Sequence, residues 1–390
     1  MDTATRSDLS QEIVEQIVHY LHDDIKTLKT LATISFAVWS ICRPLLFHSL
    51  RLNSGSHTKW AGILRNTPDL CSFIQEVVIL AGGGDYFLDR DEGLVVSILD
   101  SISRPKAIRL GKTGPSGTRP WTRLPAWLQV AISKIISRPT VREVKLAGLT
   151  QIPLSFFFGL SHIRELQLIN CTFTAPPASS SPCLKDPKVP LSTFYVKSSG
   201  TFAVHYYEFD RFLGHPQFPL DLTHLSQLHV HVKPWNYAET RRLLSICGQH
   251  LLYLSISLEG GLLRIPRLTS LCVLHFHLPM PAFAMTGETI NEIGTTLVHT
   301  PGSLSNDKNG SLQEIIISVN IKPDIFQMFP RYLWTNLDFL LVHLSPVRVQ
   351  VVTWGDQVSD WKLLLPALHE TGRLSLSSRL DLDCASFLRL

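Results

Sequence analysis

The sequence has little charge and no long apolar run. Charged residues make up 17% of its 390 residues and hydrophobic residues 45%. This balance is typical of a globular chain with a sizeable core, and it excludes a mainly disordered one. No window of about 18 residues is free of charges and turn formers, as a membrane-spanning helix requires. The N-terminus is polar and acidic, so we expect no secretory signal there and no membrane partner.

Basic runs and paired cysteines are also missing. The net charge is only +4, and lysine and arginine are dispersed, so nothing indicates a nucleic-acid-binding surface. The seven cysteines are scattered, odd in number and without a CxxC pair, which favours reduced thiols over a disulfide framework. We therefore expect a cytoplasmic or nuclear protein with no nucleic-acid partner.

Motifs for catalysis or cofactor binding are absent or incomplete. Gly111-Lys112-Thr113 is similar to the end of a phosphate-binding loop, but Lys106 stands where that motif needs glycine, and Gly114-Pro115 prevents the helix that must follow. Gly82-Gly83-Gly84 follows a predicted strand but lacks GxGxxG, so we expect a turn. There is no GxSxG, HExxH or catalytic-cysteine signature. We expect no cofactor, no catalytic residue and no enzyme; a hidden hydrolase or transferase would need a pocket with paired titratable groups.

The first part of the chain carries a helical pattern. Large apolar residues fall one turn apart and share one stripe of a short amphipathic helix: Leu9, Ile13, Ile17 and Leu21. The opposite side of this helix carries Glu12, Glu15 and His19. A second helical pattern begins at Leu28 and is expected to stop at Pro44. Residues 7–52 are too few to bury their own apolar faces well, so this module depends on the rest of the chain or on a partner.

These residues resemble an F-box, whose usual pattern opens with Leu-Pro-x-Glu, continues with isoleucine and leucine at helical spacing, and later places a tryptophan near a helix end. The matching positions are Leu9, Glu12, Ile13, Ile17, Leu21, Leu28, Leu31 and Trp39, and residues 43–52 resemble the exit seen in fungal members. The sequence departs from the family at Ser10, where proline is usual, and at Ser35-Phe36-Ala37, where Val-(Cys/Ser)-Arg is usual. The plainer alternative is an ordinary N-terminal helical hairpin.

The resemblance implies a partner for the module. Members of the family dock on the Skp-family adaptor of a cullin-RING ubiquitin ligase. Here that docking would rest on buried anchors of a helix-in-groove contact, at Leu9, Ile13, Ile17, Leu21, Leu31 and Trp39.

A strand followed by a helix recurs through residues 73–390, after a helical connector at residues 53–72. The predicted strands are residues 73–80, 107–110, 142–146, 164–168, 193–197, 227–232, 253–258, 273–278, 314–319 and 347–354. The predicted helices are residues 59–66, 94–102, 127–136, 237–247, 288–299 and 361–370. The strands recur every 20 to 40 residues or so, which is roughly the range of repeat architectures. Loops at residues 111–125, 172–190 and 300–311 interrupt the series.

The repeat is clearest at residues 163–171, which fit LxxLxLxxN/C at every apolar position. Weaker copies begin at Val141, Leu225, Leu251, Leu271 and Leu312. In each copy the two apolar residues of Leu-x-Leu point into a core, while the intervening residues point outward. We therefore predict an α/β fold in which a small N-terminal helical F-box-like module is followed by an irregular leucine-rich-repeat-like solenoid. The alternative is a mixed α/β domain of ordinary βα units.

The outward-facing strand residues form the candidate target-binding surface. Two HxH pairs are predicted on the exposed strand face, at His229, His231, His275 and His277, with Tyr253, Ser255 and Ser257 between them. Two strand steps span about 10 Å, too far for one tetrahedral zinc ion, so we expect polar strand residues or a protein-binding surface and no metal site. The same register adds Glu143, Lys145, Glu165, Gln167, Tyr195, Lys197, Glu314 and Ser318. This mixed charge favours a protein partner over a polyanion.

The sequence favours a non-catalytic adaptor. By its resemblance to F-box proteins, the module at residues 7–52 would dock the ligase, and residues 73–390 would hold a target protein for ubiquitin transfer. The alternative is a leucine-rich-repeat protein-interaction scaffold without ligase association, in which the N-terminal helices only cap the solenoid.

Overall fold

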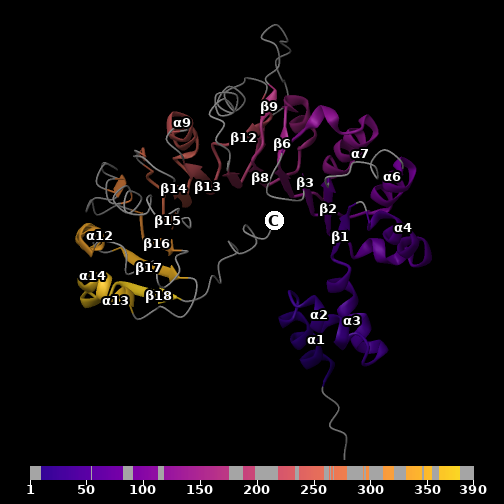
Figure 1. Ribbon diagram of the computed structural model, residues 1–390, viewed down its shortest axis with the longest axis horizontal. Coiled ribbons are helices and arrows are strands. Elements are labelled where there is room, and N and C mark those ends of the chain that lie inside the picture. Colours follow the sequence, from indigo (N-terminus) through magenta and orange to yellow (C-terminus); the bar gives the residue numbers. More distant parts are fainter. Residues whose placement is uncertain are drawn as a thin grey trace, which may run out of the picture. The chain divides into compact units, whose positions relative to one another are not determined.

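The computed structural model is mixed α/β with a large parallel sheet (Figure 1), which confirms the predicted class. The residues that it describes are 10–53, 55–81, 91–112, 118–174, 188–197, 218–232, 237–258, 263, 265–266, 268–278, 293, 296–297, 311–319, 331–344, 347–353 and 360–377. The chain divides into two units. The first comprises residues 1–113 and 124–145, and the second comprises residues 114–123 and 146–390.

Three helices of the first unit form the N-terminal module: α1 (Gln11–Tyr20), α2 (Ile25–Leu31) and α3 (Phe36–Leu46). The predicted second helical pattern is thus two helices, because Asp24 and Ser35 each accept a backbone N–H and cap the first turns of α2 and α3. The prediction that Pro44 ends the helix is wrong. Proline in a last turn removes only one backbone hydrogen bond, and α3 continues to Leu46.

The remainder of the first unit alternates strands and helices. Its strands β1 (Ser49–Leu52), β2 (Glu76–Ala81) and β3 (Ala107–Lys112) pair in parallel in this order. The first residues of β5 (Glu143–Ala147) also belong to this unit. Its helices are α4 (His57–Asn66), η1 (Pro68–Ser72), α6 (Glu92–Ser101) and α7 (Ala126–Ile136). Leu50, Val77 and Ile108 stand in register and are fully buried, and the helices of this unit lie along its strands (Figure 1). Strand β1 was not predicted, because its four residues were assigned to the end of the module.

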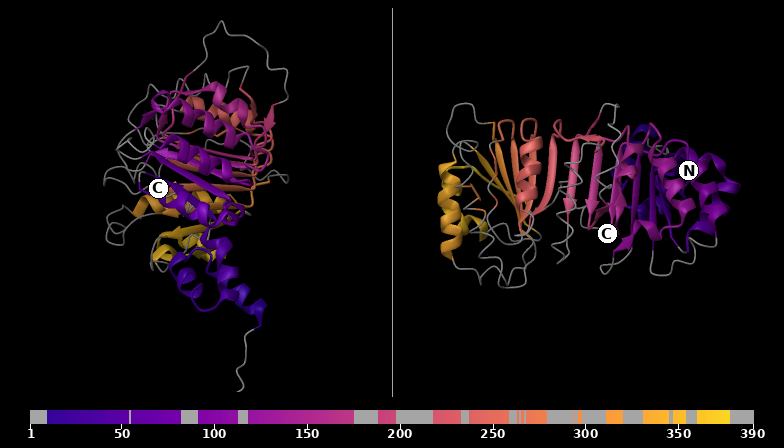
Figure 2. Two further views of the ribbon diagram at one scale, coloured as in Figure 1. Left: turned by 90° about the vertical axis from the view of Figure 1, so that its right-hand side faces the viewer. Right: turned by 90° about the horizontal axis from the view of Figure 1, so that it is seen from above.

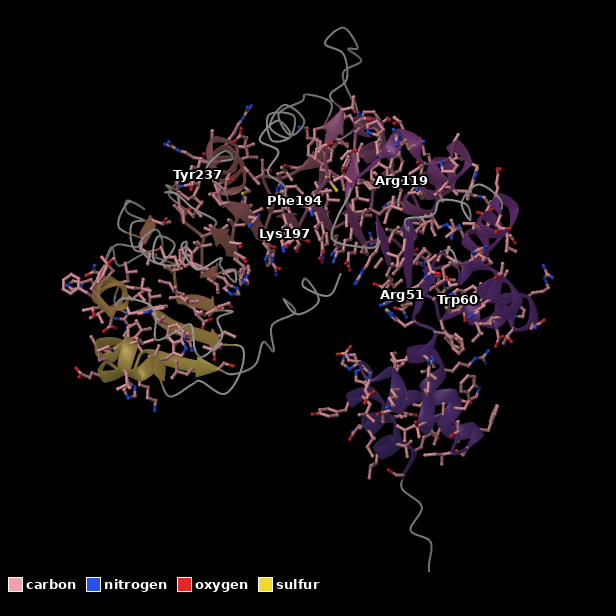
Figure 3. The ribbon with its side chains drawn as sticks, in the orientation of Figure 1. Arg51, Trp60, Arg119, Phe194, Lys197 and Tyr237 are labelled. Carbon is pink, nitrogen blue, oxygen red and sulfur yellow. The ribbon has the colours of Figure 1, made fainter. Side chains whose placement is uncertain are left out.

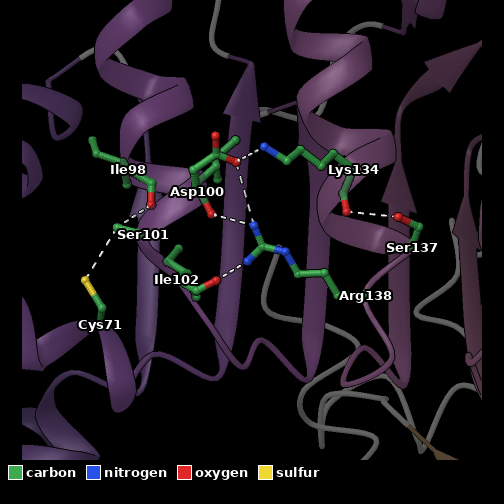
Figure 4. A network of polar contacts seen from close by, with 9 residues as sticks. Cys71, Ile98, Asp100, Ser101, Ile102, Lys134, Ser137 and Arg138 are labelled. Atoms are coloured by element: carbon green, nitrogen blue, oxygen red, sulfur yellow. Dashed lines mark hydrogen bonds and ion pairs between the residues drawn. The ribbon is translucent and has the colours of Figure 1, made fainter.

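Arg138 connects the ends of α6 and α7 (Figure 4). Its guanidinium donates to the backbone oxygens of Leu99, at 3.2 Å, and Ile102. Asp100 Oδ1 lies 2.7 Å from Lys134 Nζ and 3.8 Å from Arg138 Nη2. A cation beside the last carbonyl groups of a helix satisfies acceptors that have no partner within the helix. This contact fixes α6 against α7.

In the described part of the second unit, eight longer strands pair in parallel in chain order. They are β8 (Glu165–Ile169), β11 (Thr193–Lys197), β13 (Gln227–Val232), β14 (Tyr253–Leu258), β15 (Val273–Leu278), β16 (Glu314–Val319), β17 (Arg348–Thr353) and β18 (Leu374–Ser377). Figure 2 shows that they run side by side in one direction. Every strand predicted in residues 73–390 is therefore present within a few residues, and β18 is an additional strand.

The described helices of this unit are α9 (Tyr237–Cys247), α12 (Arg331–His343), α13 (Asp360–Leu364) and α14 (Pro366–Glu370). Helix α12 was not predicted. The single helix predicted at residues 361–370 is divided, because Pro366 opens α14 and the Asp338 carboxylate accepts the backbone N–H groups of Ala367 and Leu368. Of the helix predicted at residues 288–299, residues 293, 296 and 297 are described and helical.

Short strand pairs occupy parts of two predicted loops. They are β4 (Arg119–Pro120) with β6 (Leu149–Thr150), β7 (Ile152–Pro153) with β9 (Phe173–Thr174), and β10 (Val189–Pro190) with β12 (Leu220–Asp221). The turns η2 (Trp121–Arg123) and η3 (Leu154–Gly159) lie beside them in the chain. Residues 113–117, 175–187 and 300–310 lie outside the described part.

One face of the second unit's sheet is the core. Phe194 is in register with Leu166 and Leu228, and the row continues through Leu254 and Leu274, all at most 1% exposed. The prediction that Leu-x-Leu residues point inward is therefore confirmed. Figure 3 labels Phe194 on this face and Lys197, three residues later, on the opposite face of β11.

Candidate functional site

An exposed apolar stripe runs along α1. Ile13 is 45% exposed, Ile17 44% and Tyr20 85%, and their spacing of four and three residues places them on one side of the helix. Val14 and Val18 lie on another side and pack into the module's core with Leu28 and Cys42. Helix α1 is thus apolar on two sides, and the module itself uses only one. We call Ile13, Ile17 and Tyr20 the outer stripe.

Three further apolar side chains of the module are exposed, at Ile25, Ile34 and Phe36. Phe36 begins α3, and Ile34 lies in the turn before it. Large exposed apolar groups gathered on so short a segment are typical of a surface that binds another protein.

The predicted docking residues divide into three groups. Ile13 and Ile17 are exposed, and Leu9 lies outside the described residues. Leu21 and Leu31 are partly buried against the module's core, so the prediction that Leu21 shares one stripe with Ile13 and Ile17 is wrong. The reason is helical geometry: each four-residue step turns about 40°, so Leu21 lies about 80° away from Ile13 and faces the core.

Trp39 belongs to an aromatic chain. Its ring meets that of Phe47 edge to face at 6.1 Å, and Phe47 meets Trp60 of α4 at 6.3 Å. Close by, Arg43 Nη2 lies 2.5 Å from Asp69 Oδ2 and its guanidinium stands over the Phe73 ring. Trp39 is therefore a half-buried part of the contact between α3 and the helices that follow.

The second candidate surface is the sheet face opposite to the core row of the second unit. Two parallel rows cross it. One runs Gln167, Tyr195, His229, Ser255 and His275, and the other runs His231, Ser257, His277 and Ser318, with Tyr253 and Lys197 on the same face. We call these eleven residues the polar strand face. The register confirms that β14 separates the two HxH pairs, with Ser255 and Ser257 between them.

Much of the polar strand face is buried. His275 is 0% exposed, His231 5% and His229 8%, and Gln167, Ser255 and Ser318 are also buried. The prediction that all four imidazoles lie exposed is therefore wrong for these three histidines. Strands lie only about 4.8 Å apart, so bulky side chains in one row cover one another. Tyr195, Lys197, Tyr253, Ser257 and His277 remain partly exposed.

Hydrogen bonds connect the buried polar groups. Tyr253 Oη lies 2.6 Å from His275 Nδ1, and Ser318 Oγ lies 2.7 Å from His275 Nε2. Ser255 Oγ lies 2.9 Å from His277 Nε2. The rings of His275 and His277 are 3.9 Å apart between centroids. Both ring nitrogens of His275 thus have a hydroxyl partner.

These surroundings keep the imidazoles neutral. Burial lowers the pKa of His229 to about 4. Burial, with the charges of His277 and His229, lowers the pKa of His275 well below its usual value. Burial, with the charges of His229 and Lys197, lowers the pKa of His277 to about 4. At neutral pH each ring therefore acts as a hydrogen-bonding group without charge.

The chain from Ser318 through His275 to Tyr253 has the order of a nucleophile, a base and an orienting group. His275 is fully buried, however, and its lowered pKa makes it a weak base. Ser318 is also buried, so in the described residues neither its hydroxyl nor the His275 imidazole is exposed.

Within the described residues, no group of three or more histidine, cysteine, aspartate or glutamate side chains could hold a metal ion.

The remaining predicted target-binding residues lie elsewhere or pair locally. In the first unit, Arg109 Nε lies 2.6 Å from Glu76 Oε1, and its Nη2 lies 3.9 Å from Glu143 Oε1. Lys145 of β5 is 3% exposed, so it too differs from its predicted exposed position. In the second unit, Glu165 accepts a 2.6 Å hydrogen bond from Gln167. Glu76 and Arg109 were not predicted, although the alternation of apolar and polar residues along β3 could have indicated Arg109.

Comparison with known proteins does not assign the chain to a family. No family model matches the sequence, and a search of curated proteins finds no match. In the part of the chain that the structure describes, no helix is both long and apolar enough to cross a membrane.

Proposed function

We propose that the chain is a non-catalytic substrate-recognition adaptor of a cullin-RING ubiquitin ligase. In this proposal residues 7–52 are an F-box-like module that docks a Skp-family adaptor. The parallel strands and helices of residues 73–390 are an irregular leucine-rich-repeat-like solenoid that holds a target protein. The expected compartment is the cytoplasm or nucleus.

The outer stripe is the observation that carries the proposal. The module already has a core of its own at Val18, Leu28 and Cys42, so Ile13 and Ile17 are not needed to close it. Two exposed isoleucines one turn apart on a short helix suit insertion into an apolar groove of a partner. The sequence resemblance to an F-box falls on the same two residues.

The polar strand face supports the second half of the proposal. Its partly exposed residues combine aromatic rings, hydroxyl groups and one lysine, a composition that suits a protein partner. The adaptor would act by proximity, because a bound target is held at high local concentration beside the ligase's conjugating enzyme. The chain then supplies affinity and geometry but no nucleophile.

The alternative remains an interaction scaffold without ligase association. Ser10 and Ala37 favour it, because they replace the proline and the cation of the F-box pattern. Under this alternative the outer stripe would have no Skp-family partner.

A binding titration decides between the two. Full-length chain is titrated with the Skp-family protein of the same organism, and we expect a dissociation constant below about 1 μM, near −8 kcal/mol. The double variant Ile13→Asp/Ile17→Asp should lose binding at least about 100-fold, because two charges enter an apolar contact.

The control is Val130→Asp, which changes an exposed apolar residue of α7 outside the module. It should bind as tightly as the unchanged chain. If the double variant binds as tightly as the unchanged chain, docking does not take place through Ile13 and Ile17. If the folded, unchanged chain does not bind, the scaffold without ligase association is favoured.

A further inference from the structure

Three imidazoles of the second unit lie near one another on the polar strand face, and two of them, His229 and His275, are buried. His275 and His277 stand on β15, and His229 stands on β13, with β14 between them. The Tyr253 ring lies 5.2 Å from that of His229 and 6.1 Å from that of His275. A proton taken up by any one of these rings therefore enters a site already occupied by two other basic groups.

Among the described residues of the neighbouring strands, the carboxylates are those of Glu165 and Glu314, two residues before the row of His229 and His275. The titratable and charged groups on the strands around them are Tyr195 and Lys197 on β11, His231 on β13, Tyr253 on β14, Glu165 on β8, Glu314 on β16 and Arg348 on β17. Glu165 is the first residue of β8 and Glu314 the first residue of β16, and both lie in the register row of Val273. The Glu165 carboxylate accepts a hydrogen bond from Gln167. Lys197 is a further cation and opposes protonation of His277.

The hydrogen bonds of the cluster allow protonation, but its charges oppose it. The hydroxyls of Tyr253 and Ser318 can rotate to accept from a doubly protonated His275. A charge on His275 would nevertheless be fully buried and 3.9 Å from the His277 ring. Protonation of the folded cluster is therefore costly, whereas the same histidines in an unfolded segment are hydrated and separate.

We propose that strands β13 to β16 form an acid-sensitive element, which is ordered while His229, His275 and His277 are neutral and opens when they take up protons. On the proposed function, this element would regulate the target-binding surface, because Tyr253 on β14 and His277 on β15 are partly exposed residues of the polar strand face. Acidification would then release a target without changing the docking helices.

The direction follows from the lowered pKa values of the three histidines. Each pKa is lower in the folded segment than the value of about 6.5 expected in an unfolded chain. The unfolded segment therefore binds more protons between about pH 6.5 and pH 4, and the stability present above pH 6.5 is lost as the pH falls through this window.

The first unit contains a buried histidine of the opposite kind. His57 Nε2 lies 2.7 Å from Asp91 Oδ2, and its Nδ1 lies 3.1 Å from the backbone oxygen of Asn53. Here a carboxylate oxygen is a direct partner of the ring. Strands β2 and β3 of this unit therefore serve as an internal reference that should not open on mild acidification.

Amide hydrogen exchange of the full chain at pH 7.5 and pH 5.5 tests the proposal without any target protein. Exchange is compared as protection factors, so the pH dependence of the chemical step is removed. We expect protection in β13 to β16 to fall about 10-fold for each histidine that titrates. Protection in β2 and β3 should change less than about threefold.

The triple variant His229→Gln/His275→Gln/His277→Gln keeps side-chain amides for hydrogen bonding and removes the titration. It should lose the pH dependence of protection in β13 to β16. The control changes three exposed histidines, His162→Gln/His250→Gln/His369→Gln, and should keep that pH dependence.

If the triple variant does not fold, a pH titration of the imidazole ring resonances in the unchanged chain tests the proposal instead. Three imidazoles that stay neutral down to pH 5 support the proposal, and titration of these rings near pH 6.5 overturns it. Equal protection of β13 to β16 at the two pH values also overturns it. None of these results depends on ligase binding, so the docking proposal can fail while this one stands.

Discussion

Two arginine side chains, one in each unit, hold the carbonyl end of a neighbouring helix. Arg138 donates to the oxygens of Leu99 and Ile102 at the end of α6 (Figure 4). Arg373 Nη1 donates to Val342 O at 2.9 Å and Nη2 to Leu341 O at 3.0 Å, at the end of α12. A guanidinium suits this position because it offers several fixed donors and a charge that complements the helix dipole.

Replacing Arg138 by alanine should destabilise the first unit. The change leaves helix-end carbonyls without their donor, and we expect a loss of about 1 to 3 kcal/mol in the free energy of unfolding. Urea denaturation of the full chain measures this loss. The matched control is Arg104→Ala, an exposed arginine in the same unit, which should change stability by less than about 0.5 kcal/mol. Similar losses in the two variants would contradict the assigned role of Arg138.

Single residues also show what the sequence could and could not indicate about the polar strand face. Alternation along QLHVHV and VLHFHL was enough to place His229, His231, His275 and His277 opposite the core. Their burial depends on which side chains stand beside them on neighbouring strands. The alternation within one strand does not give the register between strands, so it could not predict this burial. The bond between His275 and Ser318 joins residues 43 apart in the chain, so local periodicity could not predict it.

At the scale of elements, α1 combines two apolar stripes in ten residues. The sequence pattern counted Leu9, Ile13, Ile17 and Leu21 as one stripe, but the structure separates Ile13 and Ile17 from Leu21 and adds Tyr20. A four-residue repeat drifts around a helix of 3.6 residues per turn, so periodicity alone cannot tell which stripe meets the core. Strand β1 was missed for a similar reason, because four residues become a strand only when β2 lies beside them.

The start of α3 depends on one serine. Ser35 Oγ accepts the backbone N–H of Val38 at 3.2 Å, and replacing an N-cap serine by alanine typically costs about 1 kcal/mol. We expect Ser35→Ala to reduce hydrogen-exchange protection of the α3 amides about fivefold, which corresponds to about 1 kcal/mol. Native-state exchange of the full chain measures this.

Ser40→Ala is the matched control within the same helix. Ser40 Oγ donates to the Phe36 backbone oxygen at 2.9 Å, a contact that adds little to a helix, and alanine is the better helix former. Protection of α3 should stay the same or rise. A larger loss in Ser40→Ala than in Ser35→Ala would show that α3 does not depend on the cap.

At the scale of the whole molecule, the two units are interleaved along the chain. Residues 114–123 belong to the second unit, although the chain before and after them belongs to the first. The described contacts explain this assignment. Arg119 and Pro120 pair with Leu149 and Thr150, and the ring of Trp121 meets that of Phe156 at 5.0 Å. The sequence predicted a loop at residues 111–125, because strands of two residues and ring contacts across 35 residues leave no periodic signal.

Two tryptophans six residues apart should therefore stabilise different units. Trp121 is buried in the second unit, and Trp127 is half-buried on α7 of the first. Trp121→Ala should reduce hydrogen-exchange protection in β7 and β8, with a loss of about 3 to 5 kcal/mol, because a large buried ring is removed. Trp127→Ala should reduce protection in β2 and β3 by a smaller amount. If both variants lower protection in the same strands, Trp121 and Trp127 stabilise the same core. The assignment of residues 114–123 to the second unit would then be wrong.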